Sequence, residues 1–286
     1  MAAQRALKVS RRERLLSLRR APNLDPELLT QSSEPETGRS AAIKAAFAAL
    51  SLENFKLLIS DNLYITSYLR SLFVAVTSTA ILLLIGYPIA YGMARLPQRW
   101  QGIAMMLVIV PFWTSFLIRI YAWINILQHD GLLNKILLAL HLVSTPVVWL
   151  STDSAMYLGI VYSYLPFMIL PLYATLAKMD FSLLEAANDL GASPRQAFWL
   201  VTFPLSLPGV GAGALLCFIP IVGEFVIPDL LAGSSSMMIG QTLWLEFFTN
   251  KDWPVASAAA IVLLVLLLAP LLLYERLQRR QLEEAR

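Results

Sequence analysis

The sequence has little charge, one cysteine and two histidines. Only 14% of its 286 residues are charged, whereas 57% are hydrophobic, and the mean hydropathy is +0.63. A soluble protein of this length has about 25% charged residues, so the composition excludes an ordinary soluble domain and indicates a membrane protein. The net charge of +3 is too small to indicate nucleic-acid binding.

The scarcity of cysteine and histidine excludes several kinds of site. Cys217 lies inside an apolar run, so the sequence has no disulfide framework, and His129 and His141 stand too far apart to indicate a metal cluster. The chain also has no phosphate-binding loop of the form G-x-x-x-x-G-K-[ST]. We therefore expect no catalytic residue, metal or cofactor, and we expect a separate subunit to hydrolyse any nucleotide.

Residues 1–40 are polar and basic, with eight Lys or Arg, and have too little apolar surface to fold. No apolar h-region follows the basic residues, so the segment does not have the form of a secretory signal peptide. Residues 41–60 are apolar only in patches and predict an interfacial or degenerate helix. We therefore divide the chain into a basic flexible arm with this helix, 1–60, and a transmembrane domain, 61–286. We favour a solvated tail over contact of these charges with anionic membrane lipid.

Five stretches are long and apolar enough to cross a membrane as helices. They are roughly residues 72–94, 103–127, 154–176, 207–231 and 255–274. The fold class that we predict is therefore all-α, as a polytopic membrane protein. Connections on one side hold eight Lys or Arg and those on the other side hold two, which places residues 181–208 and the C-terminus in the cytoplasm. The basic arm would then begin outside, unless residues 41–60 make an additional crossing.

The stretch 181–208 is polar enough to leave the membrane between two apolar runs. An Ala-rich helix start is followed by a helix-stopping glycine, a Ser-Pro helix-start pair and a further proline. These residues are Glu185, Ala186, Ala187, Gly191, Ser193, Pro194 and Pro204. The pattern predicts a helical hairpin at a membrane face. Such a hairpin is either a docking surface for a soluble protein or an ordinary connecting loop.

The hairpin resembles the EAA loop of ABC-transporter permeases, in which Glu-Ala-Ala, three residues, Gly and nine residues precede Ile-x-Leu-Pro. Here Val201-Thr202-Phe203-Pro204 stands where Ile-x-Leu-Pro is expected. Further segments resemble the polyamine (putrescine/spermidine) branch of these permeases. They are IGYPIAY (85–91), PFWTSFLIRIYAW (111–123), IVYSYLPFMILPLYATL (160–176), FIPIVGEFVIPDLLAG (218–233) and DWPVASA (252–258).

The resemblance implies the fold of a type I importer permease with six spans in the bacterial inner membrane, so one span ahead of our five is absent or degenerate. It also implies four kinds of partner: a homologous second permease, an ATPase dimer, an extracytoplasmic substrate-binding protein and the polyamine itself. Coupling to the ATPase would be carried by Glu185, Ala186, Ala187, Gly191 and Pro204.

Glu224 is our main candidate for the substrate pathway, because an ionisable group within a membrane span is costly and attracts a polycation. The alternative is that Glu224 pairs with Arg119 inside the bundle. Pro220 and Pro228 bracket Glu224 and predict an irregular helix there, while Asp229 could receive an incoming cation. Aromatic rings add cation–π attraction of about 0.5–2 kcal/mol each, unless they are interface anchors. The candidates are Trp113, Tyr121, Trp123, Tyr162 and Tyr164.

Two other functions fit parts of the pattern. A permease of the same superfamily could carry another small solute, although the acidic Glu224 argues against an anion. An ion-coupled secondary carrier would be favoured by internal repeats, and we find none in the sequence. The sequence leaves open whether putrescine or spermidine is preferred.

Overall fold

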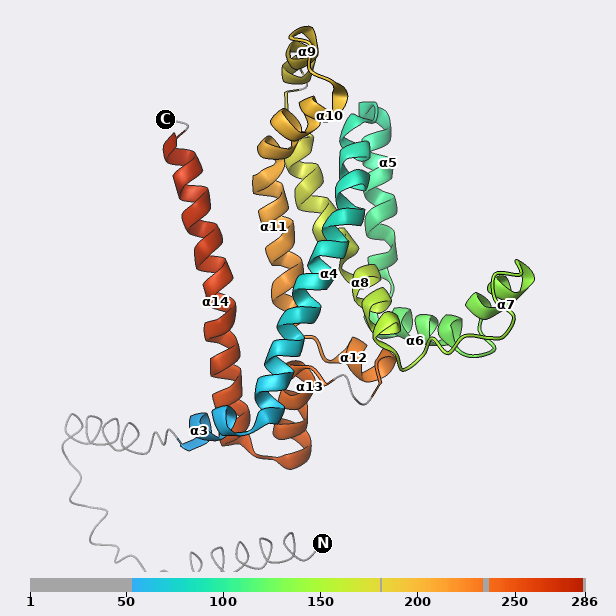
Figure 1. The fold of residues 1–286 in the computed structure, drawn as a ribbon, viewed down its shortest axis with the longest axis vertical. Helices are drawn as coiled ribbons and strands as arrows, with labels where there is room; N and C mark the ends of the chain where they lie inside the picture. Colours follow the sequence, from blue (N-terminus) through green and yellow to red (C-terminus); the bar gives the residue numbers. More distant parts are fainter. Residues whose placement is uncertain (1–52, 181, 234–236, 285–286) are drawn as a thin grey trace, which may run out of the picture. The chain divides into compact units, whose positions relative to one another are not determined.

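The computed structural model describes residues 53–284, except 181 and 234–236 (Figure 1). Our predictions for the basic arm and for a crossing within residues 41–52 therefore lie outside the described residues. Of the predicted interfacial helix, residues 53–60 are described, and they form α3 (Glu53–Ser60). All regular elements in the described part of the chain are helices, which confirms the predicted fold class.

Four helical stretches are long and apolar enough to cross a membrane. Three are the single helices α4 (Asn62–Arg95), α8 (Asp153–Leu176) and α14 (Trp253–Glu284). The fourth is a continuous stretch, Pro194–Val222, which ends in α11 (Phe203–Val222). Predicted spans overlap all four, although α4 begins ten residues before the predicted boundary and the predicted span 207–231 shares only residues 207–222 with the fourth stretch.

The predicted span 103–127 is not one straight helix. α5 (Gln98–Ile109) continues into the short η2 (Val110–Trp113), and α6 (Phe116–Leu127) then leaves at 88°. Thr114, at the break, is extended with ψ of 150°, and its side-chain hydroxyl donates to Pro111 O at 2.7 Å. The two halves are each apolar, so composition alone did not reveal the turn.

The core of the bundle is made by α4, α8 and α11, which pack against one another. Small residues allow the close approach of α11 to α8. A Cβ added to Gly209 would lie 2.6 Å from Thr175 Oγ1, and one added to Gly213 would lie 2.9 Å from Met168 Sδ. These two glycines form a GxxxG pattern, which lets helix backbones meet closely in membranes.

The predicted span 207–231 is interrupted. α11 ends at Val222, and the short α12 (Val226–Leu231) follows after a break at residues 223–225. α13 (Ile239–Trp244) then leads through the π-helical η4 (Leu245–Asn250) into α14. The predicted irregularity between the two prolines is confirmed, because Pro220 lies in the last turn of α11 and Pro228 in α12.

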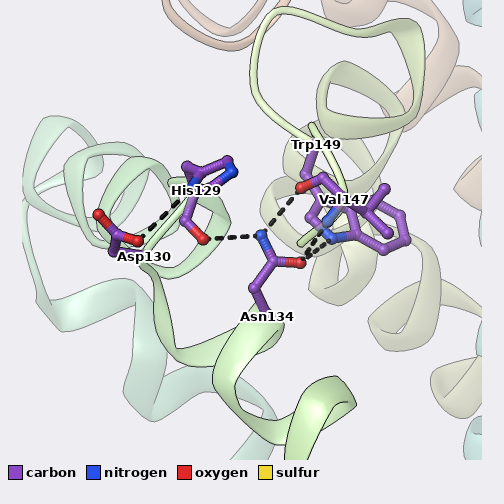
Figure 2. A network of polar contacts seen from close by, with 5 residues as sticks. All are labelled: His129, Asp130, Asn134, Val147 and Trp149. Atoms are coloured by element: carbon purple, nitrogen blue, oxygen red, sulfur yellow. Dashed lines mark hydrogen bonds and ion pairs between the residues drawn. The ribbon is translucent and has the colours of Figure 1, made fainter. Parts of the chain in front are cut away.

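At the end of the bundle where α12 lies, α6 leads to α7 (Leu132–Ala139) and a long connection (Figure 1). Asn134 of α7 is 1% exposed and ties this connection together. Its amide donates to His129 O (3.0 Å) and Val147 O (2.9 Å), and its carbonyl accepts from Val147 N and Trp149 Nε1, both at 3.1 Å (Figure 2). One polar side chain therefore fixes a connection that has little regular structure.

Candidate functional site

A helical hairpin stands at the opposite end of the bundle (Figure 1). Its first limb, α9 (Ser182–Asp189), ends in a Schellman motif, in which the Gly191 N–H donates to Asn188 O at 2.9 Å and the Ala192 N–H to Ala187 O at 3.0 Å. Gly191 has φ of +85°, a left-handed conformation that costs a side-chain-bearing residue roughly 1–2 kcal/mol. The predicted helix stop is confirmed, and the backbone favours glycine there.

The second limb begins with α10 (Pro194–Ala197), as the Ser-Pro pair predicts. Ser193 and Gln196 form a capping box: the Ser193 N–H donates to Gln196 Oε1 at 2.8 Å, and the Gln196 N–H donates to Ser193 Oγ at 3.4 Å. Both limbs therefore have local hydrogen bonds that define where the turn begins and ends.

Between α10 and α11 the helix widens into a π-helical turn, η3 (Phe198–Thr202), where the Phe203 N–H donates to Phe198 O, five residues back. The next residue is Pro204, which has no N–H to donate. A π-turn adds one residue to a helical turn and is frequent at functional sites. Pro204 was recognisable from the sequence, whereas the π-turn before it was not.

The surface of α9 is open to contact. Glu185 and Ala186 are exposed and Ala187 is half-buried, while Leu184 on the opposite face is only 8% exposed. Gly191 and Pro204 are also exposed. The small alanines leave room for another protein's surface to approach.

Asp180 caps the first turn of α9. Its carboxylate accepts the Ser182 N–H at 2.9 Å, and this hydrogen bond lowers the pKa of the Asp180 carboxyl below its usual value. The carboxylate therefore stays charged at neutral pH, where a negative charge suits the positive end of the helix dipole.

A cleft of about 560 Å³ lies beside α9 and is lined by Glu185, Arg95 and Gln101, among others. Gln101 fixes one wall of the cleft: its amide donates to Leu96 O at 2.9 Å, and its carbonyl accepts the Tyr173 hydroxyl at 3.1 Å. The corner between α4 and α5 is thus tied to α8 directly beside the hairpin.

The other candidate site is at the far end of α11, in the break at residues 223–225. Glu224 is 8% exposed. The Tyr164 hydroxyl donates to its Oε2 at 2.5 Å, and the backbone N–H groups of Val226 and Ile227 donate to its Oε1 at 3.0 and 3.4 Å. A carboxylate offers about four acceptor positions, so these three donors leave room for one more.

The packing around this break is tight. A Cβ added to Gly240, at the start of α13, would lie 2.4 Å from Gly223 O and 2.7 Å from Glu224 O. The α13 backbone therefore lies directly against the break and limits how the carboxylate can move.

Arg119 does not pair with Glu224 among the described residues. Its guanidinium instead lies 4.4 Å from the ring centre of Phe112 and 5.7 Å from that of Phe116. Its Nε and one terminal nitrogen are buried with no hydrogen-bond partner in the described part of the chain. The pairing that the sequence left open is therefore absent from this conformation.

The remaining pathway candidates lie in different surroundings. The Trp123 and Tyr162 rings pack edge-to-face with centres 5.4 Å apart, whereas Trp113 and Tyr121 are exposed. Asp229 is exposed and accepts from Gln241 at 3.5 Å. Among these aromatic candidates, Tyr164 contacts Glu224, through the hydrogen bond from its hydroxyl. No group of three His, Cys, Asp or Glu among the described residues could hold a metal ion.

Comparison with known proteins assigns the family. The family described as "Binding-protein-dependent transport system inner membrane component" matches residues 83–283. The chain belongs to this family. Its hairpin and α11 both lie within the matched region.

Curated relatives in the family match most of the chain. It is 42% identical over 228 residues to the spermidine/putrescine transport system permease protein PotB of Escherichia coli K12, covering 80% of this chain and 82% of the relative. PotB of Haemophilus influenzae is 40% identical over 227 residues, covering 79% of each chain. These values confirm the resemblance that the sequence segments indicated.

Solved structures with the same fold are more distant in sequence. A bacterial ABC transporter that imports the acidic polysaccharide alginate has a chain with a TM-score of 0.64 and 19% identity, covering 96% of this chain and 99% of that one. The MetNI methionine ABC transporter has a TM-score of 0.56 at 17% identity, covering 76% of this chain and 94% of that one. The fold is therefore that of an ABC importer permease.

Proposed function

We propose that this chain is a permease subunit of an ATP-driven importer that carries polyamines across the bacterial inner membrane. The observation that carries the proposal is Glu224, a buried carboxylate at a helix break within an otherwise apolar bundle. A carboxylate in that position suits a polycationic solute. The names of the 40–42% identical relatives support the same class of substrate.

The hairpin end is the cytoplasmic end in this proposal, together with the C-terminus, because the connections on that side hold most of the Lys and Arg. A separate ATPase dimer binds the exposed face of α9 and a matching hairpin of a second, homologous permease. Closing of the ATPase pair on ATP moves both hairpins. An extracytoplasmic binding protein delivers the polyamine to the opposite end.

Glu224 acts in the route by exchanging partners. In the structure the Tyr164 hydroxyl occupies Oε2, and two backbone N–H groups occupy Oε1. An arriving ammonium replaces the tyrosine hydroxyl, because the ammonium brings a full positive charge to the carboxylate whereas the hydroxyl brings only a dipole. The backbone donors keep the carboxylate in place during the exchange.

The test is uptake of radiolabelled putrescine and spermidine by the complete transporter with Glu224→Gln. The amide keeps an acceptor oxygen and removes the charge. We expect uptake to fall at least about tenfold, which corresponds to about 1.4 kcal/mol. Unchanged uptake at matched expression would remove Glu224 from the route.

Glu246 provides a matched control. It also accepts a hydrogen bond from a tyrosine, Tyr64, at 2.9 Å, but it lies in η4. Glu246→Gln should leave uptake within about twofold, because Glu246 lies outside the α11–α12 break and the amide keeps an oxygen that can still accept the Tyr64 hydroxyl. Equal losses in both variants would indicate destabilisation of the protein.

A further inference from the structure

A pocket of about 430 Å³ lies between the α5–α6 bend, α8 and α11. It is largely apolar, with phenylalanine rings and aliphatic side chains around one cation. Its main lining residues are Phe112, Phe116, Arg119, Ser163, Phe167 and Leu216. Tyr164, which donates to Glu224, also lines this pocket. The charged group in the pocket is Arg119, so the pocket differs in charge from the Glu224 site.

Two polar groups in this pocket have no partner among the described residues. Arg119 Nε and one terminal nitrogen are buried and unbonded, as is the hydroxyl of Ser163, which is only 3% exposed. The Phe112 ring 4.4 Å from the guanidinium offers cation–π attraction but no hydrogen-bond acceptor. Buried polar groups are nearly always hydrogen-bonded, and an unpaired buried charge is more costly still. The pocket therefore lacks an acceptor that carries negative charge.

The chemistry and position of the pocket exclude two occupants. A polyamine is repelled by the guanidinium. A lipid phosphate would have to reach the middle of the bilayer: Ser163 is ten residues into α8, roughly 15 Å along a helix that crosses a hydrocarbon core of about 30 Å. Glu224 of the same chain does not fill the pocket either, because its carboxylate is hydrogen-bonded to Tyr164 and to the start of α12.

We propose that this pocket receives a carboxylate side chain from the second permease subunit. The proposal rests on the pairing of two permeases in the proposed function. The carboxylate bonds to the free guanidinium nitrogens and accepts the Ser163 hydroxyl, so that one side chain satisfies both orphaned groups. Charged hydrogen bonds of this bidentate kind are short and geometrically specific.

The rim of the pocket fits this occupant. Phe167 is 41% exposed and Leu216 is 52% exposed, so both offer apolar surface to a neighbouring membrane helix. A partner helix that covers this rim excludes water and lipid from the ion pair. The surrounding low dielectric then strengthens the attraction between the two charges.

The first experiment places a photo-crosslinking amino acid at Phe167 in the intact transporter in membranes. The control is Leu264 of α14, which is 59% exposed on a helix that contributes nothing to the pocket. We expect Phe167 to cross-link to the second permease and Leu264 not to do so. Cross-linking of Phe167 only to lipid, or to residues 1–52 of its own chain, would overturn the proposal.

The second experiment compares Arg119→Met with Arg119→Lys and with the exposed control Arg99→Met. The measurement is the amount of second permease that co-purifies with the tagged chain in detergent. We expect Arg119→Met to lower it by about tenfold, which corresponds to about 1.4 kcal/mol, Arg119→Lys to lower it less, and Arg99→Met to leave it unchanged. Normal co-purification with Arg119→Met would overturn the proposal.

Charge exchange identifies the occupant. The Arg119→Glu variant should again co-purify with the second permease when one intramembrane Asp or Glu of that permease is changed to Lys. Rescue by Glu224→Lys in the same chain would show an internal ion pair and overturn the proposal. These results do not depend on the substrate: a transporter that pairs through Arg119 but takes up no polyamine would refute the proposed substrate alone.

Discussion

The two ends of α11 are both irregular, but in opposite ways. At the hairpin end, Trp199 and Leu200 within η3 are 61% and 74% exposed, and Pro204 follows in the first turn of α11. At the other end, Glu224 is 92% buried and holds three donors. The first irregularity exposes two large apolar side chains, although Phe198 packs against Tyr87 and Tyr91 of α4, whereas the second is closed over a charge.

This difference suits a mechanism in which movement of the hairpin causes a local rearrangement around Glu224. The exposed end can be bound by another protein, while the tight Gly209 and Gly213 contacts with α8 keep the middle of α11 stiff. Movement at the hairpin would then be passed along α11 to the residues that hold Glu224. Substitutions that disturb one end of α11 at a time test this interpretation.

The largest effect is expected at the hairpin turn, from Gly191→Val. A β-branched residue at φ of +85° costs at least roughly 1–2 kcal/mol, so the turn rearranges, and we expect uptake to fall by about tenfold or more. No heavy atom lies within 4 Å of an added Cβ, so crowding is not the cause. The measurements are uptake and substrate-stimulated ATP hydrolysis.

Gly191→Asn is the matched control, because asparagine tolerates the left-handed region better than other residues. It should retain most of the uptake. If the valine variant transported as well as the asparagine variant, the turn geometry would be irrelevant to coupling.

An intermediate effect is expected at the buried end, from Tyr164→Phe. Loss of the hydroxyl removes the donor with which an ammonium must compete, and a hydrogen bond to a charged group contributes about 1.5–3 kcal/mol. We expect KM for polyamine to fall about tenfold, which corresponds to the lower end of this range at about 1.4 kcal/mol, and the maximal rate to fall by a similar factor, because bound cation leaves more slowly. A raised KM would contradict the exchange of partners at Glu224.

The smallest effect is expected from Pro204→Ala, which restores an N–H next to the π-turn. A regular helix becomes accessible there, and the hairpin can rotate relative to α11, since one residue more or less turns an α-helix by about 100°. We expect about a twofold change in polyamine transported per ATP hydrolysed, within the range of a 0.4 kcal/mol effect. An unchanged ratio would show that the turn is not used in coupling.

The sequence predicted features that depend on neighbouring residues. Gly191 and the Ser193 cap are recognisable because helix ends require particular residue types within a few positions. The irregularity at Glu224 was predictable for the same reason, from its two flanking prolines.

Contacts between distant segments were not predictable in this way. Tyr164 and Glu224 are 60 residues apart, and several aromatics on the predicted spans were equally plausible partners. The lack of an ion pair between Arg119 and Glu224 was also not predictable. Opposite charges on two apolar helices suggest an ion pair, and only the positions of the helices in the structure show whether the two side chains meet. The bend after α5 was not predicted because the segments on both sides of it are apolar. The hydropathy of a segment does not reveal a change in the direction of the helix.

That bend has a consequence for the surrounding bilayer. The 12 residues of α5 and the four of η2 reach only about 25 Å, less than the ~30 Å hydrocarbon thickness that a spanning helix must match. α6 turns aside before the far interface, with Leu117 and Ile118 exposed. A leaflet facing this side would have to thin or be replaced by protein, which would amount to a hydrophobic mismatch on this flank. Reconstitution in bilayers of shorter acyl chains would relieve it.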